Sequence, residues 1–145
     1  DQVDAARATL ADVGIGELAA TPLKSMSTGQ QRRCILARAL VHRPRTLILD
    51  EPTAGLDFAA SFDYLARIRS LSKSGHNIVI VTHHLNEIPP EVERVILLQE
   101  GRIVADGDKR DILTGQHLTA AYGVSVRVRE IDGYFFAYPD PTQEP

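Results

Sequence analysis

Residues 46–52 read Thr46-Leu47-Ile48-Leu49-Asp50-Glu51-Pro52, an apolar run that ends in two carboxylates and a proline. A short apolar run without polar alternation is typical of a strand that is covered on both faces in a parallel sheet. Open α/β sheets bind their ligands at the carboxyl ends of the strands, so the position of Asp50 and Glu51 favours a functional site. Neighbouring side chains on a strand point to opposite faces, so the two acids are expected to have different roles. For this pair taken alone, a solvated strand end is the alternative interpretation.

A second apolar run, residues 77–82, also ends in ionisable groups, His83 and His84. Between the two runs, Asp57 is placed to cap a helix, and Gly75 is placed to end it. The apolar stripe expected on that helix consists of Phe62, Leu65, Ile68 and Leu71. Strands that alternate with helices predict an α/β domain with a parallel sheet.

Residues 1–45 are expected to be entirely helical and to form a subdomain of their own. Apolar residues at spacings of three and four predict a first helix, which ends at Gly14. A second, stronger helix reaches Val41, and Ser27 and Gln30 have the S-x-x-Q spacing of a capping box at its start.

The C-terminal part is predicted to contain two hairpins. Residues 94–105 surround Glu100-Gly101, and residues 124–138 surround Asp132-Gly133, which are both turn signals. A short helix is expected between them at residues 108–113, and residues 139–145 are expected to form a loose tail.

Composition excludes several classes of protein. One cysteine in 145 residues rules out an internal disulfide framework, and the net charge of −3 argues against a general nucleic-acid surface. No apolar run approaches the roughly 20 residues that a membrane helix needs. The first residues are helix-like and carry no signal-peptide pattern, so any membrane association is expected to come through a partner.

Four motifs occur together in one order along the chain. They are Ser27-Thr28-Gly29-Gln30-Gln31, Asp50-Glu51-Pro52-Thr53, Ala54-Gly55-Leu56-Asp57 and Val81-Thr82-His83. In this order and spacing the chain resembles the C-terminal half of an ATP-binding-cassette (ABC) ATPase of the transporter type, over residues 1 to about 120. The resemblance implies a partial P-loop NTPase fold, with ATP and Mg²⁺ as cofactors.

The stretch from Ser27 to Gln30 resembles the family's signature motif, which reaches across a dimer to the γ-phosphate held by the partner. A helix N-terminus with free amides, a hydroxyl and a glycine suits an anion, whereas a plain capped helix is the alternative. Thr28 stands where the family has a glycine, and Met26, just before the motif, replaces its usual leucine.

The other three motifs supply the expected catalytic and metal residues. Asp50 resembles the Walker B aspartate, which holds Mg²⁺ through its water shell. Glu51 resembles the catalytic carboxylate that polarises the attacking water as general base. His83 resembles the switch histidine that contacts the γ-phosphate. Asp57 resembles the aspartate of the D-loop, the family's short loop at the dimer seam, and also has the spacing of a helix cap.

The chain contains no G-x-x-x-x-G-K-[ST] phosphate-binding loop, because none of its glycines is followed by lysine. The resemblance therefore implies a chain that begins inside the helical subdomain and is inactive by itself. It divides the chain into the end of the signature subdomain (residues 1–45), an α/β core with Walker B, D-loop and switch histidine (46–123), and a C-terminal hairpin and tail (124–145).

The leading hypothesis is the nucleotide-binding subunit of an ABC transporter, which couples ATP binding and hydrolysis to transport across a membrane. The end of the chain, Leu118 to Val124, resembles importers of the metal-chelate, iron or cobalamin kind. The implied partners are a second ATPase subunit and transmembrane permease subunits, without nucleic acid, at the cytoplasmic face of the membrane. Two alternatives stay open: a soluble ABC-family ATPase of DNA repair, chromosome structure or translation, and a non-catalytic module that supplies a signature motif in trans.

Overall fold

A computed structural model describes residues 1–141 and confirms the α/β class. The chain divides into two compact units, Asp1–His83 and His84–Pro145. The division into residues 1–45, 46–123 and 124–145 stays a prediction, and residues 142–145 of the expected tail lie outside the described residues. Among the described residues, no helix has both the length and the apolar character needed to cross a membrane.

The first unit begins with helices only, as expected. They are α1 (Gln2–Asp12), the short 3-10 turns η1 (Gly16–Leu18) and η2 (Leu23–Ser25), and α2 (Thr28–Leu40). The predicted capping box of α2 is present. The Gln30 amide donates to Ser27 Oγ at 3.3 Å, and the Ser27 amide donates to Gln30 Oε1 at 2.9 Å. Two backbone donors at the start of α2 are thus satisfied by side chains.

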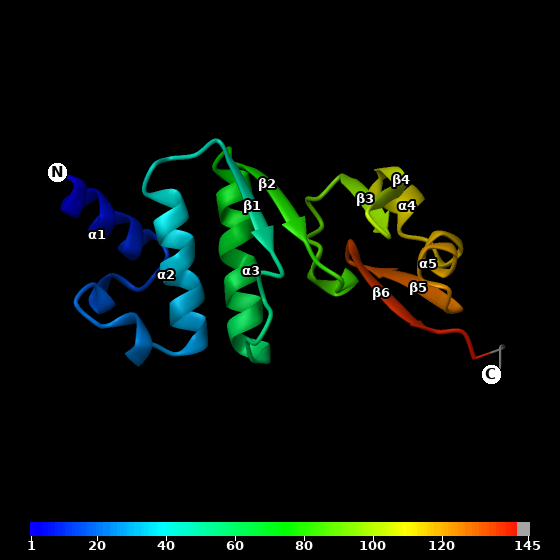
Figure 1. The fold of residues 1–145 in the computed structure, drawn as a ribbon, viewed down its shortest axis with the longest axis horizontal. Helices are drawn as coiled ribbons and strands as arrows, with labels where there is room; N and C mark the ends of the chain where they lie inside the picture. Colours follow the sequence, from blue (N-terminus) through cyan, green and yellow to red (C-terminus); the bar gives the residue numbers. More distant parts are fainter. Residues whose placement is uncertain (142–145) are drawn as a thin grey trace. The chain divides into compact units, whose positions relative to one another are not determined.

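Strands β1 (Thr46–Asp50) and β2 (Asn77–Val81) pair in parallel, with Thr46 opposite Asn77 and Asp50 opposite Val81. They are joined by α3 (Phe58–Lys73), and Figure 1 shows the two strands side by side with their carboxyl ends at the same end. Leu47 of β1 is buried in a core shared with α2 and α3, which includes Leu36, Leu40, Leu65 and Ile68. The predicted parallel arrangement is confirmed.

The expectation that both faces of this strand pair are covered is wrong for the described chain. Ile48 is 72% exposed, and Val79 and Val81 are each 47% exposed. The helices cover only the face that carries Leu47, so the opposite face keeps an apolar surface without cover in the described residues.

The buried stripe of α3 also differs from the predicted one. Phe62 is 55% exposed, whereas Tyr64 is only 4% exposed and packs in the core with Leu65 and Ile68. Phe62 instead packs edge-on against Phe58, with ring centroids 4.6 Å apart. Compared with the prediction, α3 directs Tyr64 toward the core and Phe62 away from it. A tyrosine, which carries a polar hydroxyl group, was not predicted on the buried side.

The second unit contains η3 (Leu85–Glu87) and the predicted hairpins, β3 (Arg94–Gln99) with β4 (Arg102–Asp108) and β5 (Val126–Ile131) with β6 (Tyr134–Pro139). At both turns the two central residues have positive φ, namely 49° and 74° at Glu100-Gly101 and 52° and 81° at Asp132-Gly133. This is the conformation that matches the twist of paired strands.

Two helices connect these hairpins. The short helix α4 (Lys109–Ile112) was predicted and is capped by Asp108. The helix α5 (Gly115–Tyr122) was not predicted from the sequence. It begins after Thr114, whose side chain caps it, and ends at Gly123 with φ of 70°. Leu118 and Ala121 of α5 pack with Leu97 and Ile112 in the core of this unit.

Lys109 is a buried lysine that ties three segments of the second unit together. Its side chain is only 6% exposed, and Nζ donates to the carbonyls of Pro89, Pro90 and Gly133 at 3.0–3.2 Å. The ammonium also lies 5.5 Å from the ring centre of Phe135. Burial lowers the pKa of Lys109, and the nearby carboxylate of Glu130 opposes that shift.

Replacing Lys109 with methionine keeps the apolar stem but leaves three carbonyls without their donor. We expect Lys109→Met to lower the free energy of unfolding of the chain by about 2 kcal/mol or more, measured by urea unfolding followed by circular dichroism. The matched control is Arg110→Met on the same helix, because Arg110 is exposed and makes only a surface ion pair with Glu130. Equal losses in the two variants would show that the carbonyl contacts of Lys109 do not stabilise this unit.

Candidate functional site

Glu51 and His83 meet where the two strands end. Oε1 of Glu51 lies 2.7 Å from Nδ1 of His83, and the two side chains are 32% and 69% exposed. The backbone amide of Glu51 donates to the carbonyl of Val81, the last residue of β2, at 2.8 Å. Although 32 residues apart in sequence, the two predicted catalytic residues therefore form one contact.

Glu51 does not belong to β1, which ends at Asp50. Its φ is 44°, in the left-handed region that residues with a Cβ adopt only at a cost of about 1–3 kcal/mol. The alternation of side chains along a strand therefore does not decide where the Glu51 carboxylate points. The direction of the Glu51 carboxylate follows instead from this backbone conformation, which the surrounding contacts must hold in place.

The turn after Glu51 is closed by its own backbone hydrogen bonds. The Ala54 amide donates to the Glu51 carbonyl at 3.1 Å, and the Leu56 amide donates to the Thr53 carbonyl at 3.0 Å. Asp57 then caps α3, because its Oδ1 accepts from the Ala60 amide at 2.8 Å. The structure therefore shows the capping role of Asp57, and its role at a dimer seam stays a prediction.

The predicted signature residues form the beginning of α2 and lie beside this turn. Side chains of Ser27 and Gln30 are engaged in the capping box. A Cβ added to Gly55 would lie 4.0 Å from Cγ2 of Thr28, and one added to Gly29 would lie 3.5 Å from Cβ of Ala60. The first turn of α2 is thus close to residues 55–60, and its remaining amides are the groups that suit an anion.

Two arginines of α2 contact the segment that follows β1. Arg32 Nη2 donates to the Ala54 carbonyl at 2.9 Å, and Arg33 forms an ion pair with Asp63 of α3 at 2.6 Å. Burial raises the pKa of Tyr64, and the positive charge of Arg32 partly opposes that shift. None of the four sequence motifs includes Arg32, and nothing in the local sequence names Ala54 as its acceptor.

Asp50 ends β1 with an exposed side chain. Mg²⁺ in proteins usually keeps several of its waters and binds through one or two carboxylates. An exposed carboxylate at the carboxyl end of a parallel strand therefore fits the predicted metal position, and the ion itself stays a prediction.

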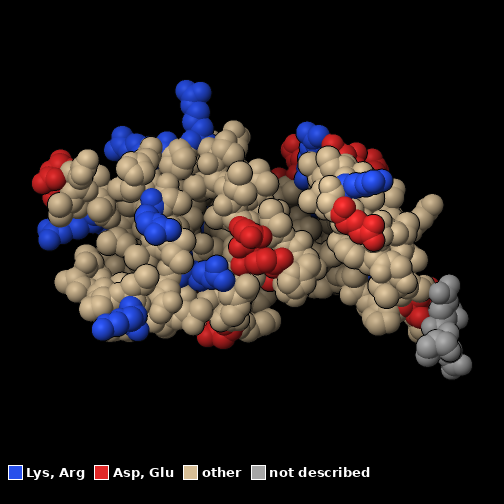
Figure 2. All heavy atoms as spheres, in the orientation of Figure 1, with Lys and Arg blue, Asp and Glu red and all other residues tan. Residues whose placement is uncertain are grey.

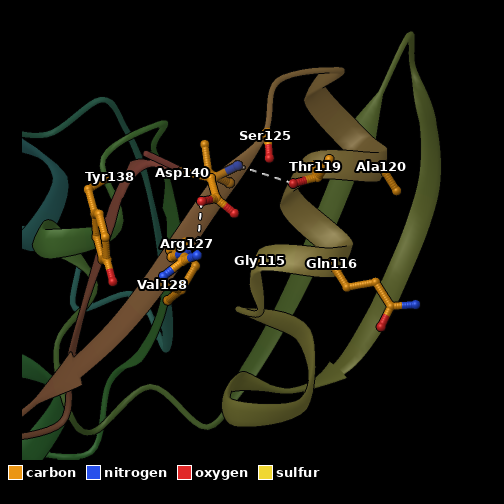
Figure 3. A pocket seen from close by; sticks show the side chains of 10 residues that line it. Gly115, Gln116, Thr119, Ala120, Ser125, Arg127, Val128, Tyr138 and Asp140 are labelled. Atoms are coloured by element: carbon orange, nitrogen blue, oxygen red, sulfur yellow. Dashed lines mark hydrogen bonds and ion pairs between the residues drawn. The ribbon is translucent and has the colours of Figure 1, made fainter. Parts of the chain in front are cut away.

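A groove of about 580 Å³ occurs in the second unit, and none of its lining residues is a predicted site residue. Figure 3 shows it between α5 and the hairpin of β5 and β6. Its polar groups pair with each other: Arg127 forms an ion pair with Asp140 at 3.0 Å, and the Val126 amide donates to Thr119 Oγ1 at 3.2 Å. The groove contains no predicted ligand-binding motif.

Lysine and arginine side chains do not gather on the face of the first unit that Figure 2 shows, where they are dispersed among uncharged residues. Within this unit, Arg33 forms an ion pair with Asp63. The charge pattern on this face is therefore unlike the continuous basic stripe by which proteins bind nucleic acid.

Strands that end in a paired carboxylate and histidine, with a capped helix N-terminus in the same unit, define an α/β protein with a candidate site at the carboxyl ends of its parallel strands. Comparisons with known proteins identify the family. A family model described as ABC transporter matches residues 1–54. A Streptococcus mutans protein assigned as an ABC transporter ATP-binding protein is 36% identical over 141 residues, which cover 95% of this chain and 54% of that protein.

Two further relatives extend the comparison. The hemin import ATP-binding protein HmuV of Rhodococcus jostii is 37% identical over 109 residues, 75% of this chain and 37% of that protein. A solved structure described as an inward-facing conformation of an ABC transporter assigned to the metal-chelate type gives a TM-score of 0.81 at 27% identity, over 93% of this chain and 55% of that chain.

The chain belongs to the family of ABC transporter ATP-binding proteins. Its fold is correspondingly that of part of an ABC ATPase, as the sequence predicted. The chain spans about half the length of the Streptococcus mutans relative.

Proposed function

We propose that this chain supplies the signature, metal-binding and water-activating parts of the ATP-binding subunit of an ABC transporter. The observation that carries the proposal is the contact between Glu51 and His83 at the carboxyl ends of two parallel strands. A carboxylate in this position is available to accept a proton from water as general base. The histidine beside it would orient the carboxylate and, being 69% exposed, is open to contact with a phosphate.

The remaining roles follow from the positions of the other predicted residues. Asp50 would hold Mg²⁺ through water, and the ion when bound would neutralise phosphate charge. Ser27, Thr28, Gly29 and Gln30 would present the first turn of α2 to a nucleotide held by a second ATPase subunit. Asp57, already the cap of α3, would lie at the seam between those two subunits.

The transport role rests on the relatives. HmuV is named for hemin import, and the solved structure is described as metal-chelate type. We propose import of a metal chelate or iron compound, with permease subunits as partners and the ATPase at the cytoplasmic face of the membrane.

Residues 1–145 alone are expected neither to bind ATP at micromolar concentration nor to hydrolyse it. The physical reason is that the sequence contains no G-x-x-x-x-G-K-[ST] loop, whose backbone amides and lysine hold the phosphates. Isothermal titration of the 145-residue chain with Mg-ATP measures this directly, with buffer injections as the control. Saturable micromolar binding would contradict the proposal that the chain provides only the part without the nucleotide cradle.

In the full-length subunit, Glu51→Gln is expected to lower kcat for ATP hydrolysis by about 100-fold or more, the contribution typical of a general base. The amide keeps the size of the side chain, so ATP binding should be unchanged. Phosphate release and nucleotide binding are measured on the same preparation. The matched control is Glu100→Gln, also a glutamate with positive φ but in a hairpin turn, and it should retain wild-type turnover. Full hydrolysis by the Glu51→Gln variant would exclude Glu51 as the base.

A further inference from the structure

Arg32 is linked to Glu51 by two hydrogen bonds that share one residue, Ala54. It lies on α2, five residues after Ser27, and its guanidinium reaches the carbonyl of Ala54 at 2.9 Å. The Ala54 amide in turn donates to the carbonyl of Glu51 at 3.1 Å. The same residue, Ala54, therefore accepts from α2 and donates to the residue that carries the predicted general base.

The backbone of Glu51 depends on such support. A residue with a Cβ at φ of 44° persists only where the surrounding structure over-determines its conformation. On the β2 side, the Glu51 amide is fixed by the Val81 carbonyl at 2.8 Å. On the other side, the turn of residues 51–54 is closed by the Ala54 amide, and the Arg32 side chain of α2 donates to the carbonyl of Ala54 in the same turn.

We propose that Arg32 is a positioning residue that couples the signature end of α2 to the Glu51 carboxylate through the backbone of Ala54, whose carbonyl accepts from Arg32 and whose amide donates to Glu51. When the start of α2 shifts, the guanidinium pulls on the Ala54 carbonyl, and the strained turn transmits the shift to Glu51 and its contact with His83. The inference rests on the proposed function for its catalytic consequence. The mechanical link between Arg32 and the turn is independent of that function.

The link itself is measured on residues 1–145 by hydrogen exchange at single amides. In Arg32→Gln the guanidinium is lost, so exchange at the Ala54 amide should become at least about fivefold faster, as expected when a local opening becomes easier. The matched control is Arg33→Gln, which removes the same charge one position later and breaks the ion pair with Asp63 instead. This control should leave exchange at Ala54 unchanged, and equal rates in the two variants would overturn the proposal.

The catalytic consequence is measured on the full-length subunit. Because Arg32 is proposed to act through the turn at Ala54, Arg32→Gln should lower kcat about 10-fold while KM for ATP stays within about twofold. Arg32→Lys, which keeps a cationic donor, should recover most of the loss, and Arg33→Gln should turn over like wild type. A change in KM without a change in kcat, or an equal loss of kcat in Arg32→Gln and Arg33→Gln, would overturn the positioning role.

The hydrogen-exchange experiment and the turnover experiment together also separate this inference from the proposed function. If the wild-type full-length subunit does not hydrolyse ATP, the proposed function fails, and the exchange result at Ala54 still decides whether Arg32 holds the turn. If hydrolysis is present and the Arg32→Gln variant exchanges and turns over like wild type, the proposed function stands and the positioning role fails.

Discussion

The left-handed conformation of Glu51 is the constraint on which the site depends. Strand β1 ends at Asp50, and Glu51 follows it with φ of 44°. In this conformation the Glu51 carboxylate lies 2.7 Å from Nδ1 of His83. Such a conformation costs about 1–3 kcal/mol and survives only where neighbouring groups fix it. The Val81 carbonyl fixes it from β2, and the Ala54 amide fixes it from the turn. The parallel pairing of β1 with β2 is thus what allows two distant residues to form one contact.

Helices α2 and α3 contribute to the surroundings of Glu51 as well as to the core. Both α2 and α3 begin near the turn after Glu51, and each start is capped by a side chain, Ser27 for α2 and Asp57 for α3. Caps leave the remaining first-turn amides available at a common end of the unit. Arg32 then joins α2 to the turn through the Ala54 carbonyl. The resulting arrangement places the proposed anion-binding helix end and the proposed general base in one connected part of the chain.

Local patterns predicted most of the elements, because caps, turns and apolar periodicity act over a few residues. The capping box of α2, the Asp57 cap and both hairpin turns were predicted in this way and are confirmed. Features that depend on tertiary contacts were missed. The rotation of α3 toward Tyr64, the exposure of Ile48 and the left-handed Glu51 depend on what packs beside each residue. The site residues were named from motifs in order, whereas the contact of Arg32 with Ala54 has no sequence signal.

A double-mutant cycle between Glu51 and His83 in the full-length subunit tests the central claim most directly. The measured quantity is the rate of ATP hydrolysis for wild type, Glu51→Gln, His83→Ala and the double variant. If the two side chains act as one unit, His83→Ala lowers the rate in the wild-type background and has little further effect once Glu51 is replaced. Independent effects, which multiply in the double variant, would contradict the account that the 2.7 Å contact forms a single catalytic element.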